Sequence, residues 1–204
     1  MNNLKTLVTI FLIGMAMNVA NGQFGVRAGA NLASLKVKVD FLGTSLAVET
    51  DDKLGGHIGV YYKTAMTESV TIRTNLIYTT GGGKVNDETT GESNSVNASY
   101  LGIPIDVMYA VPVGENSLSL MGGPFFGYLL SSSSDEGSSD EDEFSSVDYG
   151  LNFGLQFQIK ELGIGLTYGL GLANVIPDEV TSTDFFEGAS ANTRILSLFF
   201  TYDL

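Results

Sequence analysis

Five polar residues of the chain stand in otherwise apolar stretches, on the face opposite the large apolar side chains. Parity places them on one inner face, where we expect a single polar network of Arg27, Tyr61, Arg73, Asp106 and Gln156. Lys63 and Asp203 share this parity. Because an enclosed charge is costly unless it is paired, we predict a contact between Arg73 and Asp106. Paired charges would fill the interior, and a path for protons or a solute is the alternative.

The stretches that carry these residues alternate apolar with small or polar residues, a pattern typical of β-strands. Residues 148–159 show it most clearly, since one face is wholly apolar and the other carries small or amide side chains. Residues 196–204 keep the same alternation and finish on Leu204. A polar inside with an apolar outside is typical of a barrel whose exterior meets lipid. The expected strands cover residues 23–35, 54–63, 70–78, 100–110, 117–129, 148–159, 162–170 and 193–204.

The gaps between these strands alternate in length, being long after the odd strands and short after the even ones. A meander with short turns at one end and long loops at the other is typical of bacterial outer-membrane barrels, whose short turns are periplasmic. We therefore predict an all-β, eight-stranded antiparallel up-and-down transmembrane β-barrel in a Gram-negative outer membrane, with both termini periplasmic. Acidic residues gather in the expected loops: Asp40, Glu49, Asp51, Asp52, Asp87, Glu88, Glu92, six residues within 135–143, Asp178, Glu179, Asp184 and Glu187.

Residues 1–22 have the features of a cleavable signal peptide. Lys5 precedes an uncharged apolar run at 7–19, and the small residues Ala20 and Gly22 precede the expected cut before Gln23. The run is too short for a membrane-spanning helix, which needs about 18 or more apolar residues. The expected organisation is a signal peptide at 1–22 and one barrel domain at 23–204. The formal charge of −13 makes nucleic acid an unsuitable partner.

Segments that resemble ligand motifs lack the required spacing. The GGGK run at 81–84 has neither the length nor the Ser/Thr of a P-loop. The acidic run at 131–144 lacks the ligand positions of an EF-hand, and the chain has no cysteine for a thiolate metal site. We therefore expect no cofactor-binding residue and no metal site, although the loop acids could share divalent ions with lipopolysaccharide phosphates. Glycines on one face of the seventh strand would allow either close packing against bulky interior neighbours or sharp curvature of the sheet: Gly163, Gly165, Gly169 and Gly171.

His57 is the only histidine, and it shares the inward parity. A lipid-modifying membrane enzyme would need a nucleophilic serine near the outer rim with His57 as its base. Neither a serine-containing elbow nor an orienting acid stands at a recognisable spacing, so we predict no catalytic residue and no enzyme. The enzyme remains the second alternative, and activity that depends on His57 would support it.

Six segments carry a family resemblance: FGVRAGANLASL, YLGIPIDVMY, GGPFFGYLL, DYGLNFGLQFQI, LGIGLTYGLGLANV and SLFFTYDL. They resemble the PorT-type outer-membrane β-barrel domain, a group related in shape to the OmpA/OmpX barrels. The resemblance covers nearly the whole chain after residue 22 and implies an eight-stranded barrel. The group offers no catalytic signature to transfer, and its namesake implies an accessory role in protein secretion.

The function that we expect is a structural or interaction role, in which a barrel with a side-chain-filled lumen displays long acidic loops. An accessory role in protein secretion or transport, as in PorT, is the first alternative. The expected partners are outer-membrane lipid and lipopolysaccharide, the barrel-assembly machinery through the C-terminal strand, and a possible protein partner at the loops.

Overall fold

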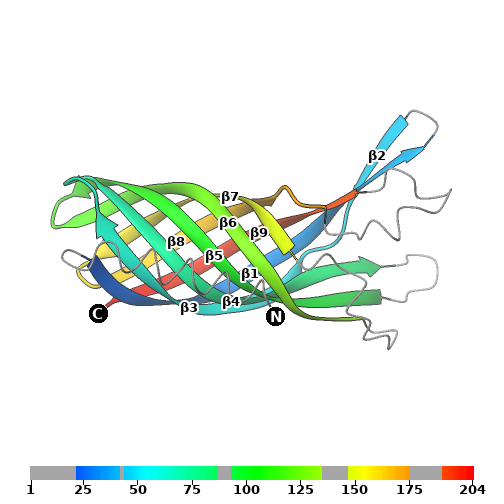
Figure 1. The fold of residues 1–204 in the computed structure, drawn as a ribbon, viewed down its shortest axis with the longest axis horizontal. Coiled ribbons are helices and arrows are strands. Elements are labelled where there is room, and N and C mark those ends of the chain that lie inside the picture. The colour runs from blue at the N-terminus through cyan, green and yellow to red at the C-terminus, as the bar shows by residue number, and fades with distance from the viewer. Residues whose placement is uncertain (1–21, 42–43, 87–92, 135–146, 175–189) are drawn as a thin grey trace.

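The structure is a computed structural model that describes residues 22–41, 44–86, 93–134, 147–174 and 190–204. These residues form nine strands in one sheet (Figure 1). The strands are β1 (Gly22–Phe41), β2 (Thr44–Glu49), β3 (Lys53–Ala65), β4 (Val70–Asn86), β5 (Ser93–Val113), β6 (Asn116–Ser134), β7 (Val147–Ile159), β8 (Leu162–Gly171) and β9 (Ser190–Asp203). The expected signal peptide lies almost wholly outside the described residues and stays a prediction.

The sheet closes on itself because β1 pairs with β9. This antiparallel ladder runs from Gly25 opposite Asp203 to Lys38 opposite Ser190. The other neighbours pair antiparallel in chain order, from β1 with β3 to β8 with β9. β2 stands outside this ring, paired with the end of β1 from Lys36 to Phe41. The ring of the other eight strands is the predicted up-and-down barrel.

Several strands continue past the bounds predicted from the sequence. β4 reaches Asn86 rather than residue 78, and β5 begins at Ser93 rather than residue 100. β6 ends at Ser134, and β1 continues to Phe41 before the chain returns as β2. The prediction of loops over these segments was therefore wrong in part.

The cause lies in the surroundings of these extensions. Beyond a bilayer both faces of a ladder can meet water, so the strand needs no apolar alternation while its backbone hydrogen bonds continue. The residues there are mostly polar or glycine, which is also the composition of loops. Of the acidic residues assigned to loops, Asp40 lies on β1 and Glu49 on β2. The acids at 87–92, 135–143 and 178–187 lie outside the described residues.

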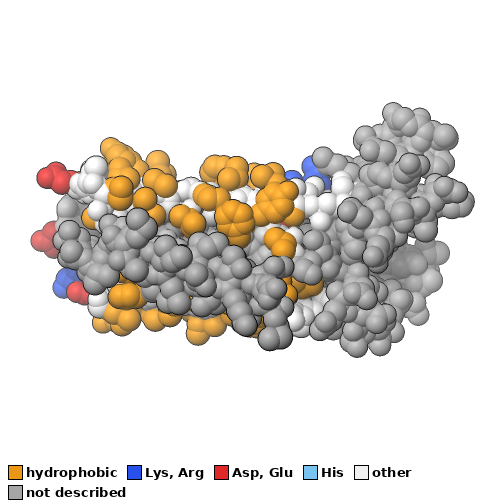
Figure 2. Space-filling model, viewed as in Figure 1, with side chains coloured by type: hydrophobic (Ala, Val, Ile, Leu, Met, Phe, Trp, Pro, Cys, Tyr) orange, Lys and Arg blue, Asp and Glu red, His pale blue; other side chains and the backbone are white. Residues whose placement is uncertain are grey.

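Apolar side chains cover the outside of the ring, as Figure 2 shows for one face. On β7, Phe153 is 51% exposed and Leu155 is 47% exposed, whereas the inward Gln156 is 2% exposed. A soluble monomer rarely exposes a continuous apolar surface of this extent. Other exposed apolar residues of the same surface are Val60, Val107, Leu120, Leu166, Leu198 and Phe200. In the described part of the chain, no helix has the length and apolar character needed to cross a membrane.

Three short turns gather at one end of the barrel, between β3 and β4, β5 and β6, and β7 and β8. Gly114 has a φ of 65° and Lys160 a φ of 52°, the left-handed conformation that tight hairpin turns require. The first residue of β1, Gly22, pairs with Thr64 beside these turns, and Asp203 pairs with Gly25. The short turns and both described ends of the chain therefore share one side, the periplasmic side in barrels of this kind.

Candidate functional site

The centre of the lumen is occupied by Arg73, whose side chain is fully buried. Its register partner on β5 is Asp106, so the two inward side chains start directly opposite each other. Arg73 Nη2 donates to Asp106 Oδ2 at 3.2 Å, and Arg73 Nη1 donates to Gln156 Oε1 on β7 at 2.6 Å. Asn75 Nδ2 also donates to Asp106 Oδ2, at 3.2 Å. Residues of β4, β5 and β7 thus hold the Arg73–Asp106 pair in the barrel interior by hydrogen bonds.

Phe199 on β9 brings the two inward arginines together. Its side chain is fully buried, with the guanidinium carbon of Arg27 3.8 Å from the ring centroid and that of Arg73 5.6 Å from it. An aromatic ring face attracts cations, so one ring can accommodate two like charges near each other. Gly165 on β8 provides the space, because a Cβ added there would lie 2.3 Å from Phe199 Cζ.

Nearer the periplasmic end, Asp203 collects three donors. Lys63 Nζ donates to Asp203 Oδ2 at 2.6 Å, and Gln158 Nε2 donates to the same oxygen at 3.0 Å. The Tyr61 hydroxyl donates to Asp203 Oδ1 at 2.5 Å. The ring of Tyr61 also lies 5.5 Å from the guanidinium carbon of Arg73, so Tyr61 joins this cluster to the central one.

On the outer side of Phe199, Arg27 is bonded to His57. Arg27 Nε donates to His57 Nε2 at 3.2 Å, and Arg27 Nη2 donates to Thr167 Oγ1 at 3.4 Å. Because arginine only donates, His57 Nε2 must accept, which leaves the ring proton on Nδ1. His57 Nδ1 then donates to Asn31 Oδ1 at 2.7 Å. The imidazole is therefore neutral in this arrangement, with both ring nitrogens occupied.

Hydrogen bonds connect four of the five predicted residues. Arg73, Asp106 and Gln156 are directly bonded, and Gln156 Nε2 donates to Gln158 Oε1 at 2.6 Å. Gln158 and Tyr61 both donate to Asp203, which links Tyr61 to the same chain of hydrogen bonds. Arg27 instead bonds to His57 and Thr167. All five predicted residues are buried and face the lumen. Ser197 donates to Asn31 Oδ1 at 2.8 Å rather than to His57, so the serine–histidine pair of a hydrolase is not formed by these two residues. The inward residues that sequence reasoning did not single out include Asn31, Asn75, Asp148, Thr167 and Phe199; inward parity was the signal available for them.

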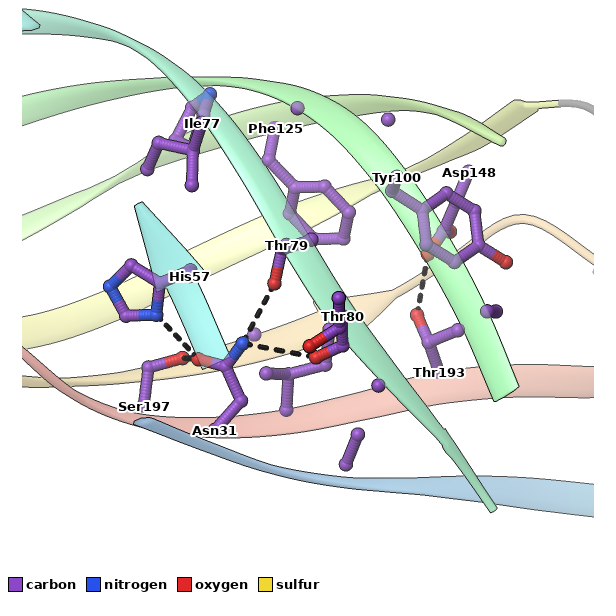
Figure 3. Close-up of a pocket in the computed structure, with 18 of the residues that line it drawn as sticks. Asn31, His57, Ile77, Thr79, Thr80, Tyr100, Phe125, Asp148, Thr193 and Ser197 are labelled. Carbon is purple, nitrogen blue, oxygen red and sulfur yellow. Dashed lines mark hydrogen bonds between the residues drawn. The ribbon is translucent and has the colours of Figure 1, made fainter. Parts of the chain in front are cut away.

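On the side of Arg27 and His57 that faces the outer end of the barrel, the lumen contains a cavity of about 130 Å³ (Figure 3). Its walls are largely apolar, with Ile77 and Phe125 among the lining residues. Tyr100 and Asp148 line the same cavity nearer the outer end of the barrel, where Thr193 Oγ1 donates to Asp148 Oδ2 at 2.7 Å. The polar clusters below and the cavity above together make the lumen a pocket with a closed floor.

Comparison with solved structures supports this architecture. Neisserial surface protein A (NspA) is similar with a TM-score of 0.52 at 14% identity, over 89% of this chain and 97% of that one. The outer membrane protein OprG of Pseudomonas aeruginosa is similar with a TM-score of 0.50 at 12% identity, over 90% of this chain and 96% of that one. Both likenesses show the fold alone.

Sequence comparison identifies the family. None of the curated proteins compared with this chain matches it. The family model of the outer membrane protein beta-barrel domain matches residues 19–177, which is most of the chain. With the closed ring and its apolar exterior, this match places the protein in the outer membrane of a Gram-negative bacterium. The chain belongs to the family of outer membrane protein beta-barrel domains.

Proposed function

We propose that this barrel has a non-enzymatic structural or interaction role, in which a rigid, closed-floored cylinder presents its external segments to a partner. The observation that carries the proposal is the arrangement of side chains in the lumen. Arg27, Phe199, Arg73 and Asp106 are all at most 5% exposed, and they lie across the path that a solute would have to follow. An eight-stranded barrel is narrow enough for its own side chains to fill.

The external extensions supply the surface for such a role. The β4–β5 ladder continues to Asn86 opposite Ser93, and the β5–β6 ladder continues to Val96 opposite Ser134. The β1–β2 hairpin projects from the same end (Figure 1). Continuous ladders would hold these segments in fixed positions relative to the barrel, which lowers the entropy lost on binding a partner.

Lipopolysaccharide is the lipid partner that fits this end of the chain. The sequence concentrates carboxylates between the external strand ends, including six within 135–143. Carboxylates and lipopolysaccharide phosphates are both oxygen ligands that suit Mg²⁺ and Ca²⁺. We expect Mg²⁺ to raise the melting temperature in vesicles containing lipopolysaccharide and not in phosphatidylcholine vesicles. An equal shift in both would remove lipopolysaccharide as the partner.

A trimming experiment tests the display role. Lys36 and Glu49 are register partners, so residues 37–48 can be replaced by Asn-Gly to close a two-residue hairpin. The trimmed barrel should still insert, but cells carrying it should show the phenotype of a deletion strain. The lumenal variant Arg73→Met with Asp106→Leu is the matched control and should behave as wild type. The opposite pattern, or stepwise ion conductance of the wild-type barrel in planar bilayers, would overturn the proposal.

An accessory role in protein secretion is the second candidate, and the resemblance of six segments to PorT-type barrels favours it. Such a role would also use the barrel as a binding platform. Its partner would be a secretion complex, which would bind the periplasmic or the external surface of the barrel. Deletion of the chain should then block the appearance of secreted proteins in the medium. Normal secretion in the deletion strain would exclude this role. The β9 strand would remain the expected contact with the barrel-assembly machinery under either function.

A further inference from the structure

We propose that the outer half of the lumen binds a small organic ammonium ion, a monocation with an apolar body about the size of one six-membered ring. Asp148 would bind the ammonium group, and the apolar wall of the cavity would enclose the body. The inference goes beyond the display role, since it assigns a ligand to the cavity rather than a partner to the external segments.

Asp148 is the residue that indicates a ligand. It is 4% exposed, and it lines the cavity as the second residue of β7. Oδ2 accepts the hydroxyl of Thr193 at 2.7 Å. Oδ1 accepts no hydrogen bond from any residue that the structure describes. A buried carboxylate oxygen without a donor is energetically costly, and a bound cation that donates to it would remove that cost.

The charges around the cavity favour a cation over an anion. Among the described residues that line it, the charged ones are Arg27 and Asp148, since His57 is neutral. Arg27 already donates to His57 and Thr167 and lies against Phe199, whereas Asp148 keeps one oxygen without a donor. The polar group that a ligand could bind is therefore a hydrogen-bond acceptor, the Oδ1 atom of Asp148.

An aromatic ring stands beside this acceptor. A Cβ added at Gly127 would lie 3.6 Å from Tyr100 Cδ1 and 3.8 Å from Asp148 Cβ, so both side chains border the same glycine. Figure 3 shows Tyr100 next to Asp148 and Thr193, with Phe125 and Ile77 deeper in the cavity. A carboxylate together with an aromatic ring is a combination that recognises organic ammonium ions through charge and cation–π attraction.

The volume limits the apolar body. The cavity measures about 130 Å³, and an engineered apolar cavity of about 150 Å³ holds one benzene molecule. Glycines at lining positions keep this space free, and Gly102 is one of them. A Cβ added at Gly102 would have no atom closer than 3.7 Å, so a larger side chain can be placed there to occupy the cavity.

Calorimetric titration of the full barrel in nanodiscs of phosphatidylcholine tests the proposal with three probes of equal size. Benzylammonium should bind with saturation, benzyl alcohol at least about tenfold more weakly, and benzoate not measurably, because only the first brings a positive charge to the Asp148 carboxylate. Heats measured with empty nanodiscs are subtracted. Equal affinity for benzylammonium and benzyl alcohol, or tighter binding of benzoate, would overturn the proposal without any substitution in the protein.

Three variants locate the site. Asp148→Asn removes the charge and should weaken benzylammonium binding about tenfold or more. Gly102→Leu fills the cavity but keeps Asp148, and it should also abolish binding. Glu115→Gln removes one negative charge from the exposed β5–β6 turn and is the matched control, which should bind as wild type. Heat-modifiable gel migration verifies the fold of each variant, and folded Asp148→Asn with wild-type affinity would contradict the inference.

Discussion

At the scale of single residues, two carboxylates of the lumen are each paired with a cation. Asp106 accepts from Arg73 and Asn75, and Asp203 accepts from Lys63. A buried ion pair contributes little net stability over an apolar pair of the same volume, but loss of one partner leaves an uncompensated charge in a low-dielectric interior. Both members of each pair must therefore be present and in contact for the interior of the barrel to pack without an uncompensated charge.

Substitution of one member of the central pair tests this requirement. Asp106→Ala leaves Arg73 without its carboxylate, so we expect the free energy of unfolding to fall by about 3 kcal/mol or more. Arg73→Met combined with Asp106→Leu should lose less than Asp106→Ala alone, because neither member of the pair then stays behind as a buried charge without its partner. Urea titrations in lipid vesicles measure both, with Glu115→Gln as an exposed control. A double variant that is less stable than the single one would contradict the account.

The proton of His57 provides a second test at this scale. The hydrogen bond from Arg27 requires an accepting Nε2, so the proton should reside on Nδ1. Nitrogen-15 NMR of histidine-labelled protein reports the tautomer directly, and one histidine gives one assignment. We expect a pyridine-type shift for Nε2 and a pyrrole-type shift for Nδ1. Arg27→Met should remove this preference, and a wild-type protein protonated at Nε2 would refute the hydrogen-bond scheme.

Sequence parity was enough to find which residues face inward, and it could not determine which of them touch. Arg73 and Asp106 lie on adjacent strands, so their contact follows from register alone. Arg27 and Arg73 meet across Phe199, which lies on a strand far away in the sequence, and that contact depends on the barrel's closure and on the volume of one ring. The sequence placed Asp148 on a strand but did not identify it as a binding residue. Its unpaired Oδ1 depends on how the surrounding side chains pack, which the sequence pattern does not show.

At the scale of elements, each strand carries an apolar face toward the exterior and a small or polar face toward the lumen. The alternation in β7 and β8 was strong enough to predict their bounds within one residue. The ends of β4 and β5 were missed because their outer segments need no alternation. The glycine face of β8 has the predicted packing role, since Gly165 lies against Phe199.

Close packing of β8 against β9 can be tested at that glycine. A Cβ at position 165 would lie 2.3 Å from Phe199 Cζ and 2.8 Å from the carbonyl oxygen of Leu155. We expect Gly165→Ala to lower the free energy of unfolding by about 1–3 kcal/mol, as overpacked cores do.

Two further variants make this result specific. Phe199→Leu shortens the opposing side chain, so adding Gly165→Ala to it should cost less than adding Gly165→Ala to wild type. Gly56→Ala on β3 is the matched control, because its nearest atom would be 3.4 Å away and alanine restricts the unfolded chain. Equal losses at positions 56 and 165 would show that the ring of Phe199 does not limit the packing.

At the scale of the whole molecule, closure and orientation follow from one distribution of side chains. The outward apolar surface requires lipid, and the closed ladder leaves no strand edge within it. The polar clusters close the floor of the lumen, and the cavity above them faces the outer end. The fold class could be predicted because both alternation and gap length repeat along the chain. The strand ends outside the membrane could not be predicted, because residues that meet water on both faces need no apolar alternation.

Spin-label scanning along β7 tests the central claim that lipid surrounds this surface. The chain has no cysteine, so each variant at positions 151, 152, 153 and 156 carries one nitroxide. In vesicles, labels replacing Leu151 and Phe153 should collide often with oxygen and rarely with a water-soluble nickel chelate. Labels replacing Asn152 and Gln156 should collide less with oxygen, giving a period of two residues. Uniform accessibility along β7, or nickel access to positions 151 and 153, would contradict a lipid-embedded barrel.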